Sequence, residues 1–373
     1  MKSYISLFVL LLMSMNALTM QAQWQRTPTP NDTLQSVRRL DDGSVIFSIY
    51  APKARTVSVA GDCIPWGPNA QQITEQPNGV WSMRVANVSE GAYRYHFVVD
   101  GMAVADPKDA RMQEQSAIAT LTTTGDEFFA LKDVPHGAIS QRTYYSTTLK
   151  AWRRLHVWTP AGYETSNKKL PVLYLVHGGG DTDVSWPSVG CAGLILDNLL
   201  AEGKMVPMVV VMPNGTIEAE DMMGEVPLFA EDMTTSIIPF IEKNYRVQTD
   251  AKHRAMAGLS MGGMETMETC FQNIDLFSYV WVLSSSFAPG RDPKSEATRL
   301  GLTPDKVGKM NKQFRQLVLC QGGPEDIAYK NCENTRAVLD ELGIKYEYTE
   351  APGGHTWFTW RRDLYNLAQR IFK

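Results

Sequence analysis

A serine framed by glycines is the feature of this sequence that most directly indicates chemistry. Residues 258–262 read Gly-Leu-Ser-Met-Gly, the G-x-S-x-G pattern in which a strand turns sharply into a helix and exposes the serine hydroxyl at the apex. The glycines leave room for the tight turn, because a Cβ at either position would collide with neighbouring backbone. Residues 253–257 suit the strand and residues 263–268 the helix. Ser260 is therefore the candidate nucleophile.

A serine hydroxyl needs a base, and the base needs an acid to orient it. In doubly wound hydrolases these residues follow the chain order serine, acid, histidine. Of the six histidines, only His355 lies after Ser260. It follows two glycines in a loop that leaves an expected strand near Glu350, at the carboxyl end of the sheet where sites form. This position predicts that His355 is the general base.

The acid is expected between Ser260 and His355, just past another strand. Residues 317–320 are mostly apolar and run into a turn that contains Glu325 and Asp326. Both carboxylates meet the requirement. We take Asp326 as the orienting acid and keep Glu325 as the alternative, since one of the two is also placed to cap the helix that follows.

A tetrahedral oxyanion needs two preorganised N–H donors. Met261 supplies one at the start of a helix, where the helix dipole also favours negative charge. The other is expected from residues 177–180, His-Gly-Gly-Gly, which directly follow an apolar strand. Gly179 is our choice of donor, with Gly178 close behind. The loop matches neither the G-x-G-x-x-G nor the lysine-containing pattern of phosphate-binding loops.

Composition argues against several other classes of function. The net charge of −4 gives no reason to expect a nucleic-acid partner. The histidines show no H-E-x-x-H spacing, so neither a metal nor another cofactor is expected. Five cysteines without a C-x-x-C pair do not make a disulfide scaffold, although the sequence allows one bridge.

Residues 1–22 have the pattern of a secretory signal peptide. Lys2 supplies the positive start, residues 5–13 an apolar core, and Ala22 a small-residue exit. The apolar run is too short to span a bilayer, and no second run of that length follows. We therefore expect a secreted or periplasmic protein that is not held in a membrane after the signal is removed. The oligomeric state is left open.

The chemistry-bearing residues lie in a half of the chain where strands and helices alternate. Such alternation predicts the α/β fold class, with a parallel sheet covered by helices on both faces. We assign this domain to residues 141–373 and a linker to residues 126–140. The expected strands are 170–176, 208–212, 253–257, 279–283, 316–319 and 346–349, and the expected helices are 194–202, 232–244, 263–268 and 331–342.

Residues 23–125 have a different sequence pattern. Short stretches rich in β-branched and aromatic residues are separated by turn signals such as Asp41-Asp42-Gly43 and Asp100-Gly101. No amphipathic pattern of helical length is present. The segment is therefore expected to form a small all-β, immunoglobulin-like sandwich. Its expected strands are 44–50, 56–59, 79–85 and 93–99.

The second half of the chain resembles carbohydrate esterase family 1, the esterase-D-like group that includes bacterial feruloyl esterases and acetylxylan esterases. The resemblance implies an α/β-hydrolase fold and a triad of Ser260, Asp326 and His355. One departure is Pro324, which stands in the acid loop where family members often have a polar residue, so Glu325 stays in play. The matching stretches are residues 154–163, 175–180, 237–245, 253–263 and 353–355.

The first half resembles an early-set domain of the type found in carbohydrate-binding module family 48. The resemblance is carried by residues 50–54, 57–61 and 91–101. Because aromatic faces suit the apolar faces of sugars, Trp66 and Trp81 are candidates for a sugar platform. Packing in the sandwich core is the other role that the sequence allows them.

Together the two resemblances imply a serine esterase that acts on plant cell-wall polysaccharide, most specifically a feruloyl esterase that releases ferulate from arabinoxylan. Ferulate needs a flat apolar slot, and Trp186, Phe229 and Trp357 lie in loops that can line such a slot or can pack in the core. Acetate needs almost no slot, which makes acetylxylan esterase the alternative. Further alternatives are a siderophore esterase of the enterochelin type and a carbohydrate-binding protein without catalysis.

Overall fold

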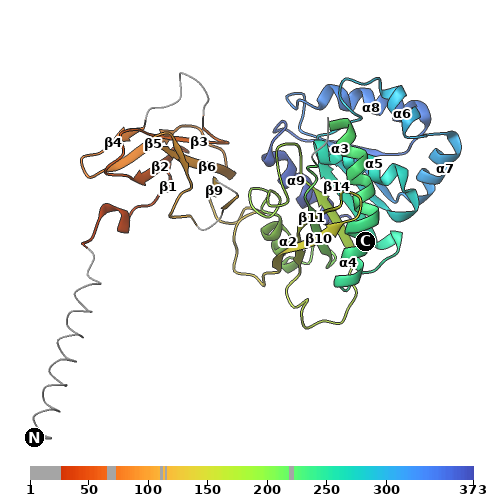
Figure 1. The fold of residues 1–373 in the computed structure, drawn as a ribbon, viewed down its shortest axis with the longest axis horizontal. Helices are drawn as coiled ribbons and strands as arrows, with labels where there is room; N and C mark the ends of the chain where they lie inside the picture. Colours follow the sequence, from red (N-terminus) through yellow and green to blue (C-terminus); the bar gives the residue numbers. More distant parts are fainter. Residues whose placement is uncertain (1–26, 65–72, 110–111, 114–115, 218–221) are drawn as a thin grey trace, which may run out of the picture. The chain divides into compact units, whose positions relative to one another are not determined.

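The computed structural model describes residues 27–64, 73–109, 112–113, 116–217 and 222–373. The chain divides into two compact units, residues 1–88 with 96–108 and residues 89–95 with 109–373 (Figure 1). Residues 109–125 were expected in the sandwich domain but group with the second unit. The expected signal peptide and Trp66 lie outside the described residues. No helix of the described ranges combines the length and apolar character that crossing a membrane requires.

The N-terminal part is all-β, as predicted. One sheet has the order β1-β2-β5-β4, and a second joins β3, β6, β9 and β8, with β7 paired to β6. Trp81 is 9% exposed and its indole N–H donates to the Ala51 carbonyl at 3.1 Å, so it is a core residue rather than an open sugar platform. The bounds are η1 (Pro30–Asp32), β1 (Val37–Arg39), β2 (Val45–Tyr50), β3 (Val57–Gly61), β4 (Thr74–Glu75), β5 (Val80–Val85), β6 (Gly91–Val99), β7 (Met102–Val104), β8 (Met112–Gln113) and β9 (Ser116–Leu121).

The second unit is built on an eight-stranded sheet of order β10-β11-β13-β12-β14-β15-β16-β17. β10 and β11 form an antiparallel hairpin, β11 pairs antiparallel with β13, and the other pairs are parallel. The predicted α/β class is confirmed. The strands are β10 (Ala138–Ser146), β11 (Ala151–Thr159), β12 (Val172–Val176), β13 (Val209–Pro213), β14 (Arg254–Leu259), β15 (Tyr279–Leu283), β16 (Gln316–Gln321) and β17 (Glu347–Glu350).

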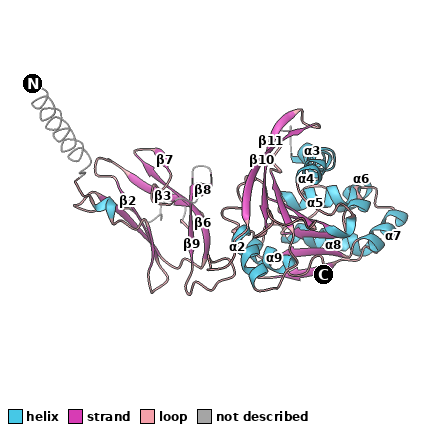
Figure 2. Cartoon of the chain, turned by 90° about the horizontal axis from the view of Figure 1, so that it is seen from below, coloured by secondary structure: helices cyan, strands magenta, loops and turns pink. Residues whose placement is uncertain are grey.

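Helices cover both faces of this sheet (Figure 2). On β12, Leu173 and Leu175 pack into one core with α2 and α9, whereas Val172 and Tyr174 pack into the other with α3, α4 and α5. This period of two is what a strand buried on both faces requires. The helices are α2 (Ala192–Ala201), α3 (Met222–Asp232), η2 (Met233–Ile237), α4 (Ile238–Asn244), η3 (Ala251–His253), α5 (Met261–Gln272), η4 (Ile274–Leu276), α6 (Pro293–Arg299), α7 (Pro304–Gln313), α8 (Tyr329–Leu342) and α9 (Trp357–Ala368).

The helix expected over residues 232–244 is divided. α3 passes into the π-helical turn η2, and α4 begins at Ile238. Pro239 thereby falls in the first turn of α4, where its missing N–H interrupts no hydrogen bond of that helix. The wide turn thus places the proline at the start of a helix instead of in the middle of one.

The strand order creates a topological switch point at the centre of the sheet. β12 lies between β13 and β14. The chain leaves β12 toward α2, which packs in one core, and leaves β14 directly into α5, which packs in the other. Ligands of open α/β sheets bind where neighbouring strands send their connections to opposite faces. The loop after β12 and the turn after β14 carry residues 177–180 and Ser260, so both predicted loops meet at this position.

Candidate active site

Ser260 stands at the junction between β14 and α5 with a strained backbone. Its φ and ψ angles are 51° and −119°, a conformation that side-chain-bearing residues rarely adopt. Its N–H donates to the Leu283 carbonyl of the neighbouring strand at 2.9 Å, and its carbonyl accepts from the Ser285 hydroxyl at 2.6 Å. The surrounding structure therefore fixes the turn that projects the hydroxyl.

The glycines of the motif are required by contact distances. A Cβ on Gly258 would lie 2.0 Å from the Gly262 carbonyl oxygen, and a Cβ on Gly262 would lie 2.3 Å from the His177 carbonyl oxygen. Gly263 is equally restricted, with Ser285 Cβ at 2.4 Å. No side chain fits at such separations without moving backbone, which explains why glycine occupies all three positions.

His355 connects the serine to an acid. Its Nε2 is 2.9 Å from Ser260 Oγ, and its Nδ1 is 2.8 Å from Asp326 Oδ1. The three side chains come from the ends of β14, β16 and β17, which are parallel strands, so all three meet at one edge of the sheet. This order of contacts allows His355 to take a proton from Ser260 while Asp326 holds the ring in orientation.

The structure brings Asp326, rather than Glu325, to the histidine. Asp326 is 3% exposed, and its carboxylate also accepts hydrogen bonds from the backbone N–H groups of Ala328 at 2.9 Å and Gly322 at 3.2 Å. Burial by itself would raise the pKa of Asp326, but the hydrogen bonds from His355 and Ala328 outweigh it and hold the pKa below its ordinary value. The group is therefore a carboxylate at neutral pH.

Glu325 has a separate role in the same loop. Its side chain is exposed, and its Oε1 accepts from the Gly353 N–H at 3.1 Å. That hydrogen bond lowers the pKa of Glu325. Glu325 therefore ties the acid loop to the glycines that precede His355 and does not contact the imidazole ring.

The glycine loop lies against the nucleophile, as an oxyanion site requires. A Cβ on Gly178 would lie 3.1 Å from Ser260 Cβ, and one on Gly179 would lie 3.9 Å from Met261 Cβ. His177 shapes this loop, because its Nε2 accepts from the Gly215 N–H at 2.9 Å while its Nδ1 lies 2.8 Å from the Gly178 carbonyl. Met261 opens α5, so its backbone N–H lies at the positive end of the helix dipole.

Comparison with known proteins identifies the family of this chain. Residues 146–371 match the esterase family model. The chain belongs to the esterase family. Residues 34–112 match the model of carbohydrate-binding module 48, the isoamylase N-terminal domain. Both resemblances inferred from the sequence are thereby confirmed.

Curated relatives of this esterase are longer chains. An endo-1,4-beta-xylanase/feruloyl esterase from Xylanibacter ruminicola is 32% identical over 350 residues, which are 89% of this chain and 45% of the relative. Endo-1,4-beta-xylanase Y of Acetivibrio thermocellus is 26% identical over 302 residues, 74% of this chain and 27% of that protein. This chain spans less than half the length of these relatives.

Solved structures agree with the fold. A ferulic acid esterase is 25% identical with a TM-score of 0.55, covering 63% of this chain and 97% of its own. A mutant of the feruloyl esterase module from Clostridium thermocellum, complexed with sinapinate, is 24% identical with a TM-score of 0.57 and covers 66% and 92%. The enterobactin esterase Fes from Shigella flexneri, 18% identical with a TM-score of 0.60, covers 89% and 96%. The last two likenesses speak for the fold alone.

The aromatic residues expected to line an acyl slot are core residues of the esterase. Trp186, Phe229 and Trp357 are 1%, 0% and 7% exposed. Phe229 packs among the helices of one core, and the Trp186 indole N–H donates to the Val176 carbonyl at 3.1 Å. The expectation that they line an open slot is corrected, because side chains of this size gain more by filling the layers beside the sheet than by facing water.

Two of these tryptophans instead belong to an aromatic column behind the histidine. The rings contact one another edge to face. The distance between ring centroids is 5.0 Å for Trp186 and Trp357, 5.3 Å for Trp357 and Trp360, and 5.0 Å for Trp360 and His355. Such perpendicular contacts are a favoured geometry for aromatic rings. The column therefore packs against the His355 ring, whose Nδ1 and Nε2 atoms make the contacts to Asp326 and Ser260. Trp360 was not anticipated from the sequence, although it lies five residues after His355 on α9.

A second buried acid lies near the triad. Asp363, on α9, is 5% exposed, and its Oδ2 has no hydrogen-bond partner within the described residues. Burial, and to a smaller extent the charge of Asp326, raise the pKa of Asp363 to about 8. In the unfolded chain the same carboxyl titrates near its ordinary pKa of about 3.9. The folded esterase therefore holds this proton more tightly than the unfolded chain does.

The difference between the folded and unfolded pKa of Asp363 makes the stability of the esterase depend on pH. The stability contributed by protonated Asp363 is complete below the unfolded pKa and is lost as the pH rises toward about 8. Asp363→Asn removes the titration, so the free energy of unfolding of the variant should gain on that of the wild type by up to about 1.4 kcal/mol per pH unit between pH 5 and 8. Urea unfolding at several pH values measures this gap. Asp126→Asn, at an exposed site, is the control. The raised pKa of Asp363 is contradicted if the difference in unfolding free energy between Asp363→Asn and the wild type does not change with pH, or if Asp126→Asn shows the same change with pH.

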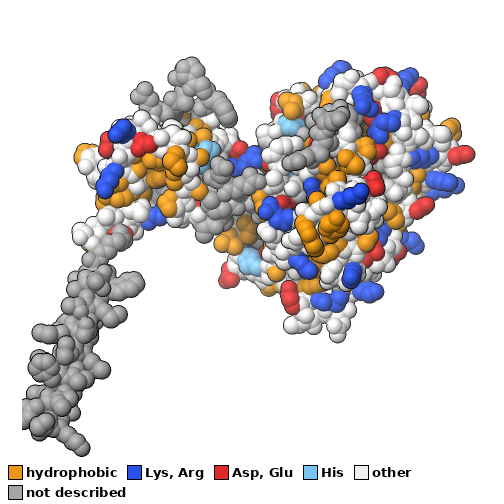
Figure 3. All heavy atoms as spheres, in the orientation of Figure 1, with side chains coloured by type: hydrophobic (Ala, Val, Ile, Leu, Met, Phe, Trp, Pro, Cys, Tyr) orange, Lys and Arg blue, Asp and Glu red, His pale blue; other side chains and the backbone are white. Residues whose placement is uncertain are grey.

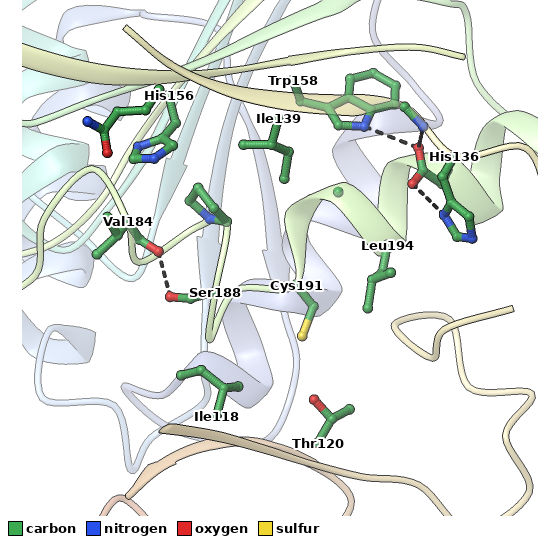
Figure 4. A pocket seen from close by; sticks show the side chains of 15 residues that line it. Ile118, Thr120, His136, Ile139, His156, Trp158, Val184, Ser188, Cys191 and Leu194 are labelled. Atoms are coloured by element: carbon green, nitrogen blue, oxygen red, sulfur yellow. Dashed lines mark hydrogen bonds and ion pairs between the residues drawn. The ribbon is translucent and has the colours of Figure 1, made fainter. Parts of the chain in front are cut away.

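A cavity of about 590 Å³ in the second unit is drawn in Figure 4, and its lining includes none of the three triad residues. Two histidines line it, and both face acids: His136 Nδ1 is 2.9 Å from Asp197 Oδ2, and His156 Nδ1 is 2.7 Å from Asp183 Oδ2. The Ser188 hydroxyl at its wall donates to backbone and amide oxygens. The cavity therefore does not repeat the serine–histidine pairing seen at Ser260.

The described part of the chain contains neither a cluster of metal-binding side chains nor a disulfide bond. Within the described residues no group of three or more His, Cys, Asp or Glu side chains is arranged to hold a metal ion. The five cysteines are free thiols, so the bridge that the sequence allowed is not formed. On the face drawn in Figure 3, basic and acidic side chains are interspersed over the second unit.

Proposed function

We propose that this esterase is a serine carboxylic-ester hydrolase that releases ferulate from plant cell-wall polysaccharide. The observation that carries the proposal is the line of contacts from Ser260 Oγ to His355 Nε2 at 2.9 Å and from His355 Nδ1 to Asp326 Oδ1 at 2.8 Å. These are the contacts by which a serine becomes a nucleophile at neutral pH.

In the proposed first step His355 accepts the Ser260 proton as Oγ attacks the ester carbonyl. The Asp326 carboxylate keeps the Nδ1 proton in place and stabilises the imidazolium that forms. The N–H groups of Met261 and Gly179 receive the developing oxyanion. The imidazolium then gives its proton to the departing sugar oxygen as the C–O bond breaks, which leaves an acyl group on Ser260.

In the second step water takes the place of the sugar alcohol. His355 removes a proton from this water as its oxygen attacks the acyl carbonyl, and the same two N–H groups hold the second oxyanion. The Ser260–acyl bond breaks, the proton returns to Oγ, and the free acid leaves. Apart from the ester and water, every group used in these two steps belongs to the polypeptide.

Ferulate as the acyl group is supported by the relatives. The relative from Xylanibacter ruminicola carries both xylanase and feruloyl esterase in its name and aligns along 89% of this chain. The burial of Trp186 and Phe229 removes them as a reason to prefer an aromatic acid over acetate. The preference for ferulate therefore rests on the relatives and not on a slot. Export through the predicted signal peptide, which brings the esterase to an extracellular polysaccharide, is part of the same proposal.

The test is a side-by-side assay of methyl ferulate and acetylated xylan with the full chain. We expect hydroxycinnamate release with a kcat/KM at least tenfold above that for acetate release, because ester hydrolases discriminate acyl groups through their pockets. Acetate release without ferulate release would overturn the proposed substrate and leave the serine mechanism standing. Hydrolysis of neither ester would overturn the proposed activity.

A further inference from the structure

Two aromatic side chains project from the β10–β11 hairpin into solvent. Tyr145 and Trp152 are 48% and 73% exposed. They are directly opposite each other in the antiparallel register, and their rings meet edge to face with centroids 5.5 Å apart. Large apolar side chains gathered on a surface mark binding sites more often than isolated ones do. The pair therefore requires an explanation beyond packing.

The hairpin carries this pair to the edge of the sheet where Ser260 lies. Leu155 of β11 pairs with Pro213, the last residue of β13, so Trp152 extends beyond the carboxyl end of that strand. Its neighbour Arg153 donates to the carbonyls of Asn214 and Thr216 at 2.5 and 2.9 Å.

The loop held by Arg153 is joined to the glycine loop. The Thr216 hydroxyl donates to the Asp181 carbonyl at 3.2 Å, and the Gly215 N–H donates to His177 Nε2 at 2.9 Å. His177 and Asp181 flank the glycines that lie against Ser260. The aromatic pair and the nucleophile are thus connected through one set of hydrogen-bonded loops.

Polar groups accompany the rings on the same face of the hairpin. Thr143 and Arg154 are opposite each other, two residues along from Tyr145 and Trp152, and side chains two apart on a strand share a face. Arg154 is fixed by hydrogen bonds of 2.8 Å to both carboxylate oxygens of Asp183, yet its side chain is 43% exposed. A rigid guanidinium and a hydroxyl beside two ring faces suit a ligand that is apolar on one face and rich in hydroxyls at its edges.

We propose that Tyr145, Trp152, Thr143 and Arg154 form a platform that binds the sugar chain to which the cleaved ester is attached. The proposal rests on the proposed polysaccharide esterase function and extends it to a named surface. Sugar rings stack on the aromatic faces, and their hydroxyls accept from Arg154 and Thr143. The platform holds the polysaccharide while its ester group reaches Ser260.

The test compares two substrates that differ in the sugar chain alone. For the full-length Trp152→Ala variant, kcat/KM for feruloylated xylo-oligosaccharides divided by kcat/KM for methyl ferulate should fall about tenfold, the loss expected for one stacking contact. Trp152→Phe keeps a ring and should recover most of the ratio. Leu131→Ala, at an exposed apolar residue of the same unit, is the matched control. A ratio unchanged in Trp152→Ala, or equal in Trp152→Ala and Leu131→Ala, overturns the platform.

Binding without turnover separates this proposal from the proposed activity. In a Ser260→Ala background, titration calorimetry with unesterified xylo-oligosaccharides should give a Kd that rises about tenfold when Trp152→Ala is added. That result supports the platform even if the wild type fails to cut ferulate esters. Equal Kd values with and without Trp152 overturn it even if ferulate is released.

Discussion

Replacing Ser260 by alanine should lower kcat for ester hydrolysis by roughly 10⁴- to 10⁶-fold, because no other group takes over covalent catalysis once the nucleophile is lost. The Cβ of Ser260 is kept in alanine, and the strained turn is held by backbone hydrogen bonds to Leu283 and by Ser285. The fold should therefore survive, so the loss reports chemistry rather than unfolding.

The measurement is steady-state hydrolysis of an aryl ester together with thermal unfolding of each variant. Adding His355→Ala to Ser260→Ala should cost little more, because the two residues act as a unit and their losses do not add. Ser295→Ala, at an exposed position of helix α6, serves as the matched serine control. Near-wild-type turnover by Ser260→Ala would show that this serine is not the nucleophile.

The sequence predicts the parts of this esterase that depend on local rules. Short apolar runs in the sequence predict the central strands β12 to β16, because strands buried on both faces carry apolar side chains throughout. The hairpin of β10 and β11 is not among the expected strands. The G-x-S-x-G motif indicates Ser260 as the candidate nucleophile, and chain order indicates His355, because it is the one histidine that follows this serine. Steric demands visible in the sequence explain the glycines at 258 and 262, whose Cβ positions are filled by backbone.

What the sequence did not predict depends on packing between distant segments. Trp186, Phe229 and Trp357 are large residues near loops, and nothing local distinguishes a pocket wall from a core residue. Whether these side chains are buried depends on the space between the sheet and its helices, which only the assembled fold defines. The same applies to the exposed Tyr145 and Trp152, since alternation along a strand gives opposite faces but does not say which face another element covers.

Turn geometry decides which of the adjacent residues Glu325 and Asp326 orients His355. After β16 the chain turns at Gly323, whose φ is 90°, and the Asp326 N–H donates back to the Gly323 carbonyl at 2.9 Å. This turn directs Asp326 inward to His355 and leaves Glu325 in solvent. Adjacent residues in a tight turn point in different directions, and composition alone does not give the direction.

The geometry of the acid loop leads to the second large expected effect. Asp326→Asn should lower kcat/KM by roughly 10³- to 10⁴-fold, because an amide neither carries the charge that stabilises the imidazolium nor enforces the tautomer in which Nδ1 bears the proton. Hydrogen bonds hold the pKa of Asp326 below its ordinary value, so the wild type has this charge throughout the neutral range. The measurement is hydrolysis of methyl ferulate at pH 7.

Glu325→Gln is the matched control at the neighbouring position. Glu325 is exposed and accepts a single backbone hydrogen bond from Gly353, and glutamine keeps an oxygen that accepts the same bond. Its kcat/KM should stay within about threefold of the wild type, as expected for an exposed substitution that costs less than about 0.6 kcal/mol. If Glu325→Gln lost activity and Asp326→Asn kept it, the acid of the triad would be Glu325. The difference between the two variants thus tests the turn geometry and the chemistry in one experiment.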